Sequence, residues 1–367
     1  MVIIRALGSN SGGQLATGDM EDAHYLTTTR FSQESRVEDA RTKWLVQGGG
    51  NHAYAWTDNG PTLLACGSNT DGELAMGEGV RRSVLCWTPV SFPGDFVRQV
   101  ACGWSHTLLL NDLGQVFATG SNAFGQLGSL SKEARKWVRV NGPVFVSIAC
   151  GMRHSLALDK DGVVYGWGAN RCGQLGIDRR SANISVPTPV EGLPPIAMIA
   201  CGRSHSILVA QDRRTVYVAG QDKYAQYGPS SQSGAWQTFQ LPRPAVKLCS
   251  GWDFGAILLE PNNHNNVVMW GRADQGQLAC RVDGSYRREL GFVELPDVSD
   301  IACGASHTVA ITATGSVYMW GWNEHGNAGD PTLANVYSPL CVQDLQSNIE
   351  HRALGIGCGY GNSYIVS

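Results

Sequence analysis

Short apolar runs recur along the whole chain and are separated by turns rich in Gly, Asn and Asp. The run "HTLLL" at 106–110, for example, leads through "NDLG" into "QVFATG". Asn, Asp and Gly supply the positive-φ positions of tight turns, so such a pair of runs predicts a β-hairpin. Runs such as "PTPVEG" and "VSIACG" supply an outer strand and a returning strand. The pattern predicts an all-β protein built from units of about four strands.

Two sequence signatures alternate along these units. The first is Gly-x-x-His, as in "GWSH" from Gly103, and Phe254 and Asn362 replace its His in two copies. The second is G-S-N-x-x-G-Q-L-G, as in "GSNAFGQLG" from Gly120. Each occurs seven times, and the first recurs every 48 to 55 residues. A unit of about four strands at this period is typical of a propeller blade, so the sequence predicts a seven-bladed β-propeller.

The two chain ends carry half a unit each. The chain begins with a strand at 2–8 and ends with a first signature and strand at 359–366. We expect these strands to pair in one closing blade, because a closed ring leaves no exposed sheet edge. Residues 1–367 then form a single propeller domain.

Composition and the N-terminal sequence limit the expected cellular location and partners of this propeller. The net charge of −3 does not indicate a dedicated nucleic-acid surface, and no apolar run is long enough to span a membrane. The apolar start of the chain is short and interrupted by Arg5, unlike a signal peptide. The 11 Cys form no C-x-x-C pair, which favours reduced thiols. We therefore expect a cytoplasmic protein, present in the nucleus as well, without nucleic-acid or membrane partners.

The repeated His and Cys residues are candidates for metal ligands or for structural roles. Equivalent positions in different blades lie around a ring and do not converge on one ion, so we favour structural roles. Each signature His is expected to hydrogen-bond its own blade, and the Cys near the signature Gly to fill space beside the axis. No P-loop, H-E-x-x-H or G-x-S-x-G motif occurs. The sequence predicts no catalytic residue, cofactor or metal site, and hence no enzyme.

The variable positions between the signature Gly and His are better candidates for function. They occupy equivalent turns, so they should surround the central tunnel on one rim. Aromatic and Arg side chains are enriched in interface hot spots, although Trp residues also fill gaps between blades. Arg side chains on this rim would suit an acidic partner. The candidates are Trp104, Arg153, Arg203, Trp252, Asp253 and Tyr360.

The segment "WGWNEHGNAGD" at Trp320–Asp330 is the last copy of the second signature. Trp322 stands where most copies have Ser or Ala, and Glu324 and His325 occupy the two variable slots. Three interpretations are open: an acid–base pair, a partner contact, or a hydrogen bond that stabilises the loop. Because function is often placed in the variable slots of a repeat, we include Trp322, Glu324 and His325 among the partner-binding candidates.

The paired signatures resemble the repeats of the regulator of chromosome condensation family over the whole chain. The Trp320–Asp330 segment resembles two branches: the fungal alpha-tubulin-suppressor propeller, also known from killer-toxin insensitivity, and the secretion-regulating exchange-factor-like protein of animals. The compact chain and "ACGWSH" are more similar to the fungal branch. That resemblance implies a heterodimer with a small acidic CSL-type iron or zinc protein. It further implies roles in diphthamide synthesis on elongation factor 2 and in Elongator-dependent modification of tRNA wobble uridines, with Elongator as a further partner.

Two alternatives follow from the wider family. One is a guanine-nucleotide exchange factor or regulator of a small Ran-like GTPase. The even repeat spacing shows no inserted wedge and the chain has no basic N-terminal arm, which disfavours this alternative. The other is a substrate-recognition propeller within a ubiquitin-ligase assembly.

Overall fold

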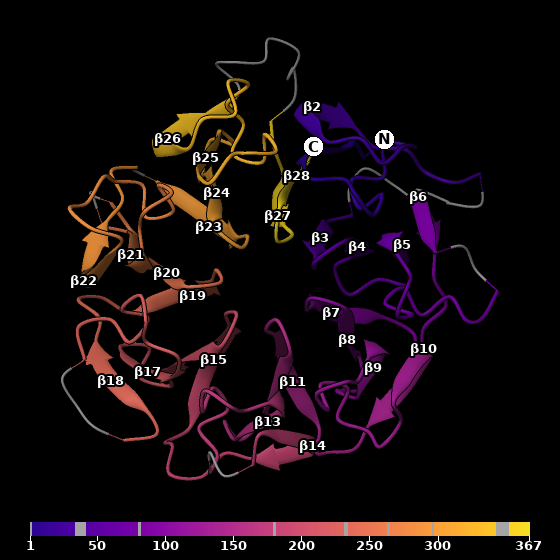
Figure 1. Ribbon diagram of the computed structural model, residues 1–367, viewed down its shortest axis with the longest axis horizontal. Coiled ribbons are helices and arrows are strands. Elements are labelled where there is room, and N and C mark those ends of the chain that lie inside the picture. Colours follow the sequence, from indigo (N-terminus) through magenta and orange to yellow (C-terminus); the bar gives the residue numbers. More distant parts are fainter. Residues whose placement is uncertain are drawn as a thin grey trace.

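The computed structural model describes residues 2–33, 42–79, 82–178, 181–230, 234–262, 265–295, 297–342 and 352–367. These residues form seven four-stranded antiparallel sheets arranged around a ring (Figure 1). The seven-bladed propeller predicted from the repeats is confirmed. Within the described ranges, no helix has the length and apolarity required to cross a bilayer.

We number the blades from the first one made of consecutive strands. Blade 1 contains β3 (Trp44–Gly48), β4 (His52–Thr57), β5 (Leu63–Ser68) and β6 (Ser83–Pro89). Blade 2 contains β7 (Val97–Cys102), β8 (His106–Asn111), β9 (Val116–Ser121) and β10 (Glu133–Val140). Blade 3 contains β11 (Phe145–Cys150), β12 (His154–Asp159), β13 (Val164–Ala169) and β14 (Asn183–Pro189). Blade 4 contains β15 (Ile196–Cys201), β16 (His205–Ala210), β17 (Thr215–Gly220) and β18 (Gln237–Gln240).

Blade 5 contains β19 (Ala245–Ser250), β20 (Phe254–Leu259), β21 (Val267–Arg272) and β22 (Tyr286–Phe292). Blade 6 contains β23 (Val298–Cys303), β24 (His307–Thr312), β25 (Val317–Gly321) and β26 (Val336–Cys341). Blade 7 contains β27 (Gly355–Cys358), β28 (Asn362–Val366), β1 (Ile4–Gly8) and β2 (Ala23–Thr28).

Blade 7 closes the ring with strands from both ends of the chain. Its order is β2-β1-β28-β27, so the N-terminal part supplies the two outer strands and the C-terminal part the two inner strands. β1 and β28 pair without a register shift from Ile4↔Val366 to Gly8↔Asn362. The N- and C-terminal strands accordingly lie in the same blade in Figure 1.

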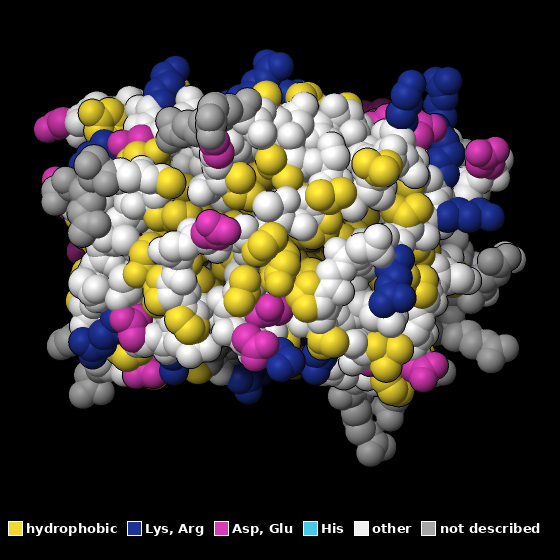
Figure 2. All heavy atoms as spheres, turned by 90° about the horizontal axis from the view of Figure 1, so that it is seen from below, with side chains coloured by type: hydrophobic (Ala, Val, Ile, Leu, Met, Phe, Trp, Pro, Cys, Tyr) yellow, Lys and Arg dark blue, Asp and Glu magenta, His cyan; other side chains and the backbone are white. Residues whose placement is uncertain are grey.

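The hydrophobic core lies between neighbouring blades. Every residue of β4, β8, β12, β16, β20 and β24 is buried, because these strands are covered on both faces. Large side chains such as Trp167, Trp270 and Trp320 are fully buried. Figure 2 views the outer wall, where hydrophobic side chains gather at mid-height and charged ones lie mostly nearer the two edges. The inter-blade packing thus explains why the strand runs are apolar without alternation.

The second signature stabilises one turn and joins it to the next blade. In blade 2, Asn122 Oδ1 accepts a hydrogen bond from the Leu127 amide at 2.8 Å, and Gln126 Oε1 accepts one from the Phe124 amide at 2.8 Å. The Trp167 indole of blade 3 donates to the Gln126 carbonyl at 2.8 Å. Gly120 has φ +103, and a Cβ there would lie 2.4 Å from a backbone carbonyl. Asn, Gln and Gly are therefore structural residues of the repeat.

The first signature joins neighbouring blades through its His. His106 Nε2 of blade 2 hydrogen-bonds with Ser155 Oγ of blade 3 at 3.1 Å. The expectation that each His bonds its own blade is wrong, since the ring reaches the hydroxyl of the next one. A Cβ on Gly103 would lie 2.1 Å from the His106 ring, which explains the Gly of the signature. The other four pairs are His52–Thr107, His154–Ser206, His205–Ser250 and His307–Ser363.

Glu73 replaces the Gln of the second signature in blade 1, so it tests the structural role of that Gln. Its carboxylate is buried, accepts a hydrogen bond from the Asp71 amide at 2.9 Å, and has a pKa raised to about 7 by burial. As pH rises from about 4.5 to 7, the unfolded state releases this proton first, so Glu73 lowers stability at higher pH. We expect Glu73→Gln to raise the free energy of unfolding by about 1–3 kcal/mol at pH 8 and by less at pH 5.

Urea denaturation at both pH values measures this difference. The exposed Glu78 lies in the same loop, and Glu78→Gln is the matched control. An equal gain at pH 5 and pH 8 would show that the effect is not due to the buried carboxylate.

Candidate partner-binding face

The first-signature turns form one face of the propeller, together with the second-signature turns to which they are joined; we call it the loop face. The inner turns are linked from blade to blade by main-chain hydrogen bonds. The Trp252 amide donates to the Ala305 carbonyl at 2.9 Å, Ala305 to Tyr360 at 2.9 Å, and Tyr360 to Gly49 at 3.0 Å. Further links of the same kind are Gly50–Gly103, Trp104–Met152 and Arg203–Trp252. These links hold the variable side chains on a fixed frame.

Three aromatic side chains from distant blades meet at the centre of the loop face. The rings of Trp104 and Tyr360 are stacked with centroids 5.9 Å apart, and Trp252 contacts them at 5.9 and 5.6 Å. Since these residues belong to blades 2, 7 and 5, the rings meet only by crossing the axis. We call Trp104, Trp252 and Tyr360 the aromatic cap. Of the residues predicted to surround the tunnel on one rim, these three meet over its mouth.

The cap separates two cavities. The inner cavity, of about 240 Å³, runs between the innermost strands of the blades and is lined partly by Tyr360. Six repeated Cys line it as well: Cys102, Cys150, Cys201, Cys249, Cys303 and Cys358. Burial raises the pKa of the Tyr360 hydroxyl well above its ordinary value. Among the described residues, no group of three or more His, Cys, Asp or Glu is arranged to hold a metal ion.

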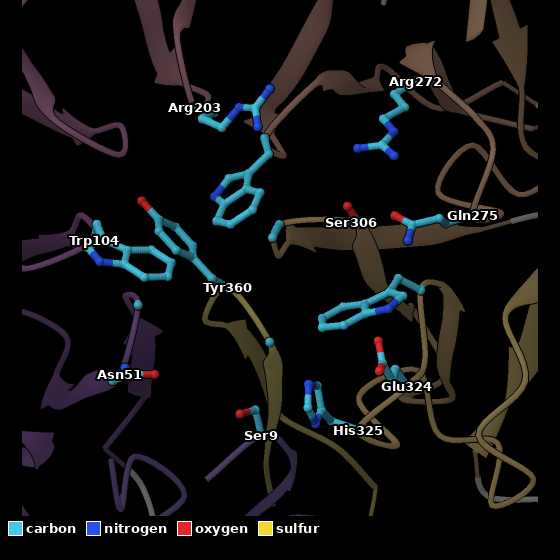
Figure 3. A pocket seen from close by; sticks show the side chains of 15 residues that line it. Ser9, Asn51, Trp104, Arg203, Arg272, Gln275, Ser306, Glu324, His325 and Tyr360 are labelled. Atoms are coloured by element: carbon cyan, nitrogen blue, oxygen red, sulfur yellow. The ribbon is translucent and has the colours of Figure 1, made fainter. Parts of the chain in front are cut away.

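The outer cavity, of about 370 Å³, opens on the loop face and contains most of the predicted site. Figure 3 shows Trp104 and Tyr360 on one side, Glu324 and His325 on the other, and Arg203 and Arg272 along a third side. Seven of the nine sequence-predicted residues line it: Trp104, Arg203, Trp252, Trp322, Glu324, His325 and Tyr360.

The other two predicted residues do not line this cavity. Asp253 is only 2% exposed, with Oδ1 3.4 Å from Arg203 Nη2 and Oδ2 3.8 Å from Arg272 Nη1. It lies beneath the surface, where Gln226 Nε2 donates a hydrogen bond of 3.1 Å to Oδ1 and the two guanidinium groups offset its charge. Burial raises the pKa of Asp253, and the two Arg oppose that rise. Arg153 is exposed but lies over the Phe124 ring at 4.5 Å, outside the cavity lining.

Arg272 is a lining residue that the sequence reasoning missed. Besides its contact with Asp253, it forms two hydrogen bonds of 2.8 Å with the Asp274 carboxylate. It follows the signature Gly271 directly, at the position that Trp322 occupies in the next copy. The same comparison between copies that singled out Trp322 would have found it.

The Glu324 and His325 side chains have different surroundings. His325 Nδ1 lies 2.6 Å from Asp22 Oδ2 in blade 7, and the His325 ring contacts Trp322 at 5.1 Å. His325 therefore stabilises the loop as well as lining the cavity. Glu324 is exposed, and within the described ranges its side chain has no hydrogen bond or ion pair. Among the described residues, no hydrogen bond joins the Glu324 and His325 side chains, and His325 Nδ1 faces Asp22 instead.

Two known proteins are similar to this chain in sequence. The secretion-regulating guanine nucleotide exchange factor of Mus musculus is 33% identical over 99% of this chain and 83% of its own length. The probable E3 ubiquitin-protein ligase HERC4 of Rattus norvegicus is 33% identical over 81% of this chain and 29% of its own length.

The solved structure of Prp20p from Saccharomyces cerevisiae, described with its binding to Gsp1p and histones, supports the fold alone. It has a TM-score of 0.83 at 20% identity, covering 100% of this chain and 91% of its own. None of these similarities shows a specific closeness to the fungal tubulin-suppressor branch. Residues 4–365 match the family described as the RCC1-like domain. The chain belongs to the RCC1-like propeller family.

Proposed function

We propose that the loop face docks a protein partner, and that the first candidate partner is a small GTPase whose nucleotide state the propeller regulates. The observation that carries the docking proposal is the aromatic cap beside an open cavity. Trp and Tyr dominate interface hot spots because they bury a large apolar area at a low cost in side-chain entropy. The mouse relative is named as a guanine nucleotide exchange factor, which supports a GTPase as the partner.

The fixed frame of the loop face favours binding without rearrangement. The blade-to-blade main-chain bonds hold Trp252 and Tyr360 in place before a partner arrives. A preorganised surface loses less conformational entropy on binding, so more of the contact energy appears as affinity. The role we propose is binding without covalent chemistry.

The small CSL-type metalloprotein of diphthamide synthesis is the second candidate partner, with Elongator-dependent tRNA modification as its setting. The feature that favours it is "ACGWSH", which is more similar to the fungal branch, whereas the Trp320–Asp330 segment resembles both branches. Trp322, Glu324 and His325 of this segment all line the outer cavity. Either partner would therefore bind the loop face around the outer cavity. One experiment can compare the two candidates.

That experiment titrates the purified propeller with each candidate by calorimetry. A Ran-type GTPase loaded with a fluorescent GDP analogue also reports nucleotide release. The proposal expects binding of one candidate, with release accelerated if it is the GTPase. Trp104→Ala should weaken that binding, whereas Leu113→Ala, an exposed residue of the turn between β8 and β9 at the opposite end of the strands, should not. If the Trp104→Ala and Leu113→Ala variants bound the partner with the same affinity, docking at the loop face would be contradicted.

A further inference from the structure

We propose that the outer cavity receives an alkylammonium group, the side-chain head of a lysine or methylated lysine presented by the protein partner. This inference rests on the proposed docking function and adds the chemistry of one contact. It differs from the expectation of an acidic partner, which rests on Arg153 and Arg203.

The walls of the cavity are suited to a cation. Four aromatic residues line it: Trp104, Trp252, Trp322 and Tyr360. The faces of aromatic rings carry negative potential and attract alkylammonium groups, which several converging rings hold better than one. In Figure 3 the Trp104 and Tyr360 rings lie across the cavity from Glu324, two residues after Trp322 in the same loop. A guest between these walls would contact rings and a carboxylate together.

The charges around the cavity leave one carboxylate free. Arg203 lies 3.4 Å from the buried Asp253 and 5.9 Å from the centroid of the Trp252 ring, and Arg272 is bound by Asp274 and lies 3.8 Å from Asp253. Two cations and two anions thus balance on that side. Glu324 is exposed, without an ion pair among the described residues, so the charge left over is negative. An anionic guest would have to compete with Asp253 and Asp274 for the two Arg side chains.

The deviation of this copy from its repeat agrees with a binding role. In most copies the residue after the second-signature Gly is small, such as Ser121 or Ala169, whereas here it is Trp322. The same turn forms in the copies with Ser121 and Ala169. The indole therefore adds apolar wall to the cavity without being needed for the fold of the loop.

The test compares choline with its neutral isostere 3,3-dimethylbutan-1-ol on the full-length protein. Both probes have the same shape, and only choline is charged. The indole N–H signals of Trp104, Trp252 and Trp322, assigned by single substitutions, report occupancy of the cavity by NMR. We expect choline to shift these signals with an affinity at least about five-fold higher than that of the alcohol. Acetate, as an anionic probe, should leave them unshifted.

Two variants connect this binding to the residues named. Glu324→Gln changes an exposed side chain and should weaken choline binding while leaving the alcohol unaffected; Trp322→Ala should weaken both. Glu294→Gln, an exposed carboxylate elsewhere, is the control and should change neither. Equal affinities for choline and the alcohol, stronger shifts with acetate, or choline binding unchanged in Glu324→Gln would each overturn the inference. If Trp104→Ala still weakened binding of the protein partner in that case, the docking proposal would be supported and only the proposed cation contact would be wrong.

Discussion

Acidification from pH 6.5 to pH 4 is expected to destabilise this propeller far more steeply than a protein without buried imidazoles. Burial lowers the pKa of His52, His106 and His205 to about 3 and of His154 and His307 to about 4. The unfolded chain binds these protons near pH 6.5. Between those values the unfolded state holds more protons than the native state, so the free energy of unfolding falls as pH falls.

The expected magnitude follows from the number of groups. Between its native and its unfolded pKa, each buried His changes the free energy of unfolding by about 1.4 kcal/mol per pH unit. Where all five are protonated in the unfolded state and neutral in the native state, the slope is about 7 kcal/mol per pH unit. Typical domains have a total stability of about 5–15 kcal/mol. The measurement is urea denaturation at closely spaced pH values between 6.5 and 5, where the raised pKa of Glu73 opposes the slope by about one proton.

The repeat itself supplies matched variants for this prediction. Blade 5 carries Phe254 in place of His, so His106→Phe should lower the pH slope by about one proton while costing about 1 kcal/mol for the lost bond to Ser155. Ser155 keeps its hydrogen bond to the Gln126 carbonyl. The reverse change, Phe254→His, should add about one proton to the slope. A slope near zero, or one that neither variant alters, would contradict the account of the His residues.

The aromatic cap carries the second large expected effect. We expect Trp104→Ala to reduce partner affinity by about 30-fold or more, equivalent to about 2 kcal/mol, because truncating a central aromatic anchor removes a hot spot. Trp104 is 38% exposed, so the free energy of unfolding should change by less than about 1 kcal/mol. Calorimetric titration gives the first quantity and urea denaturation the second. A large loss of stability with unchanged affinity would assign the indole to packing instead.

Tyr360→Phe is the conservative companion variant. It keeps the ring that stacks on Trp104 at 5.9 Å and removes only the hydroxyl. If apolar area is what the cap contributes, affinity should change little in this variant. A loss as large as that of Trp104→Ala would indicate that the hydroxyl makes a specific contact.

The sequence predicted the number of blades, the closing blade and most of the cavity residues, because all of these follow from comparing copies of one repeat. Residues such as Trp104 and Trp322 stand out wherever a copy carries a large side chain in a slot that needs only a turn. The burial of Asp253 was not predictable in this way. Its slot is equivalent to that of Ser105 or Ser306, and the sequence does not show that Arg203, Gln226 and Arg272 gather around its carboxylate.

The His residues show the same limit for contacts between blades. Spacing identified His106 as structural, but its partner Ser155 lies in the following repeat, 49 residues away. Which hydroxyl the ring reaches depends on how neighbouring blades pack, and the repeat pattern does not contain that information. The convergence of Trp104, Trp252 and Tyr360 over the axis likewise follows from the radius of the ring.

Photo-crosslinking tests the central claim, docking at the loop face, most directly. A benzoylphenylalanine residue placed at Asn51, an exposed residue lining the outer cavity, should crosslink to the bound partner. The same residue placed at Leu113, in the turn between β8 and β9 at the opposite end of the strands, should not. The account predicts a partner adduct at position 51 that is lost in the Trp104→Ala background. An adduct at position 113 with none at position 51 would contradict it.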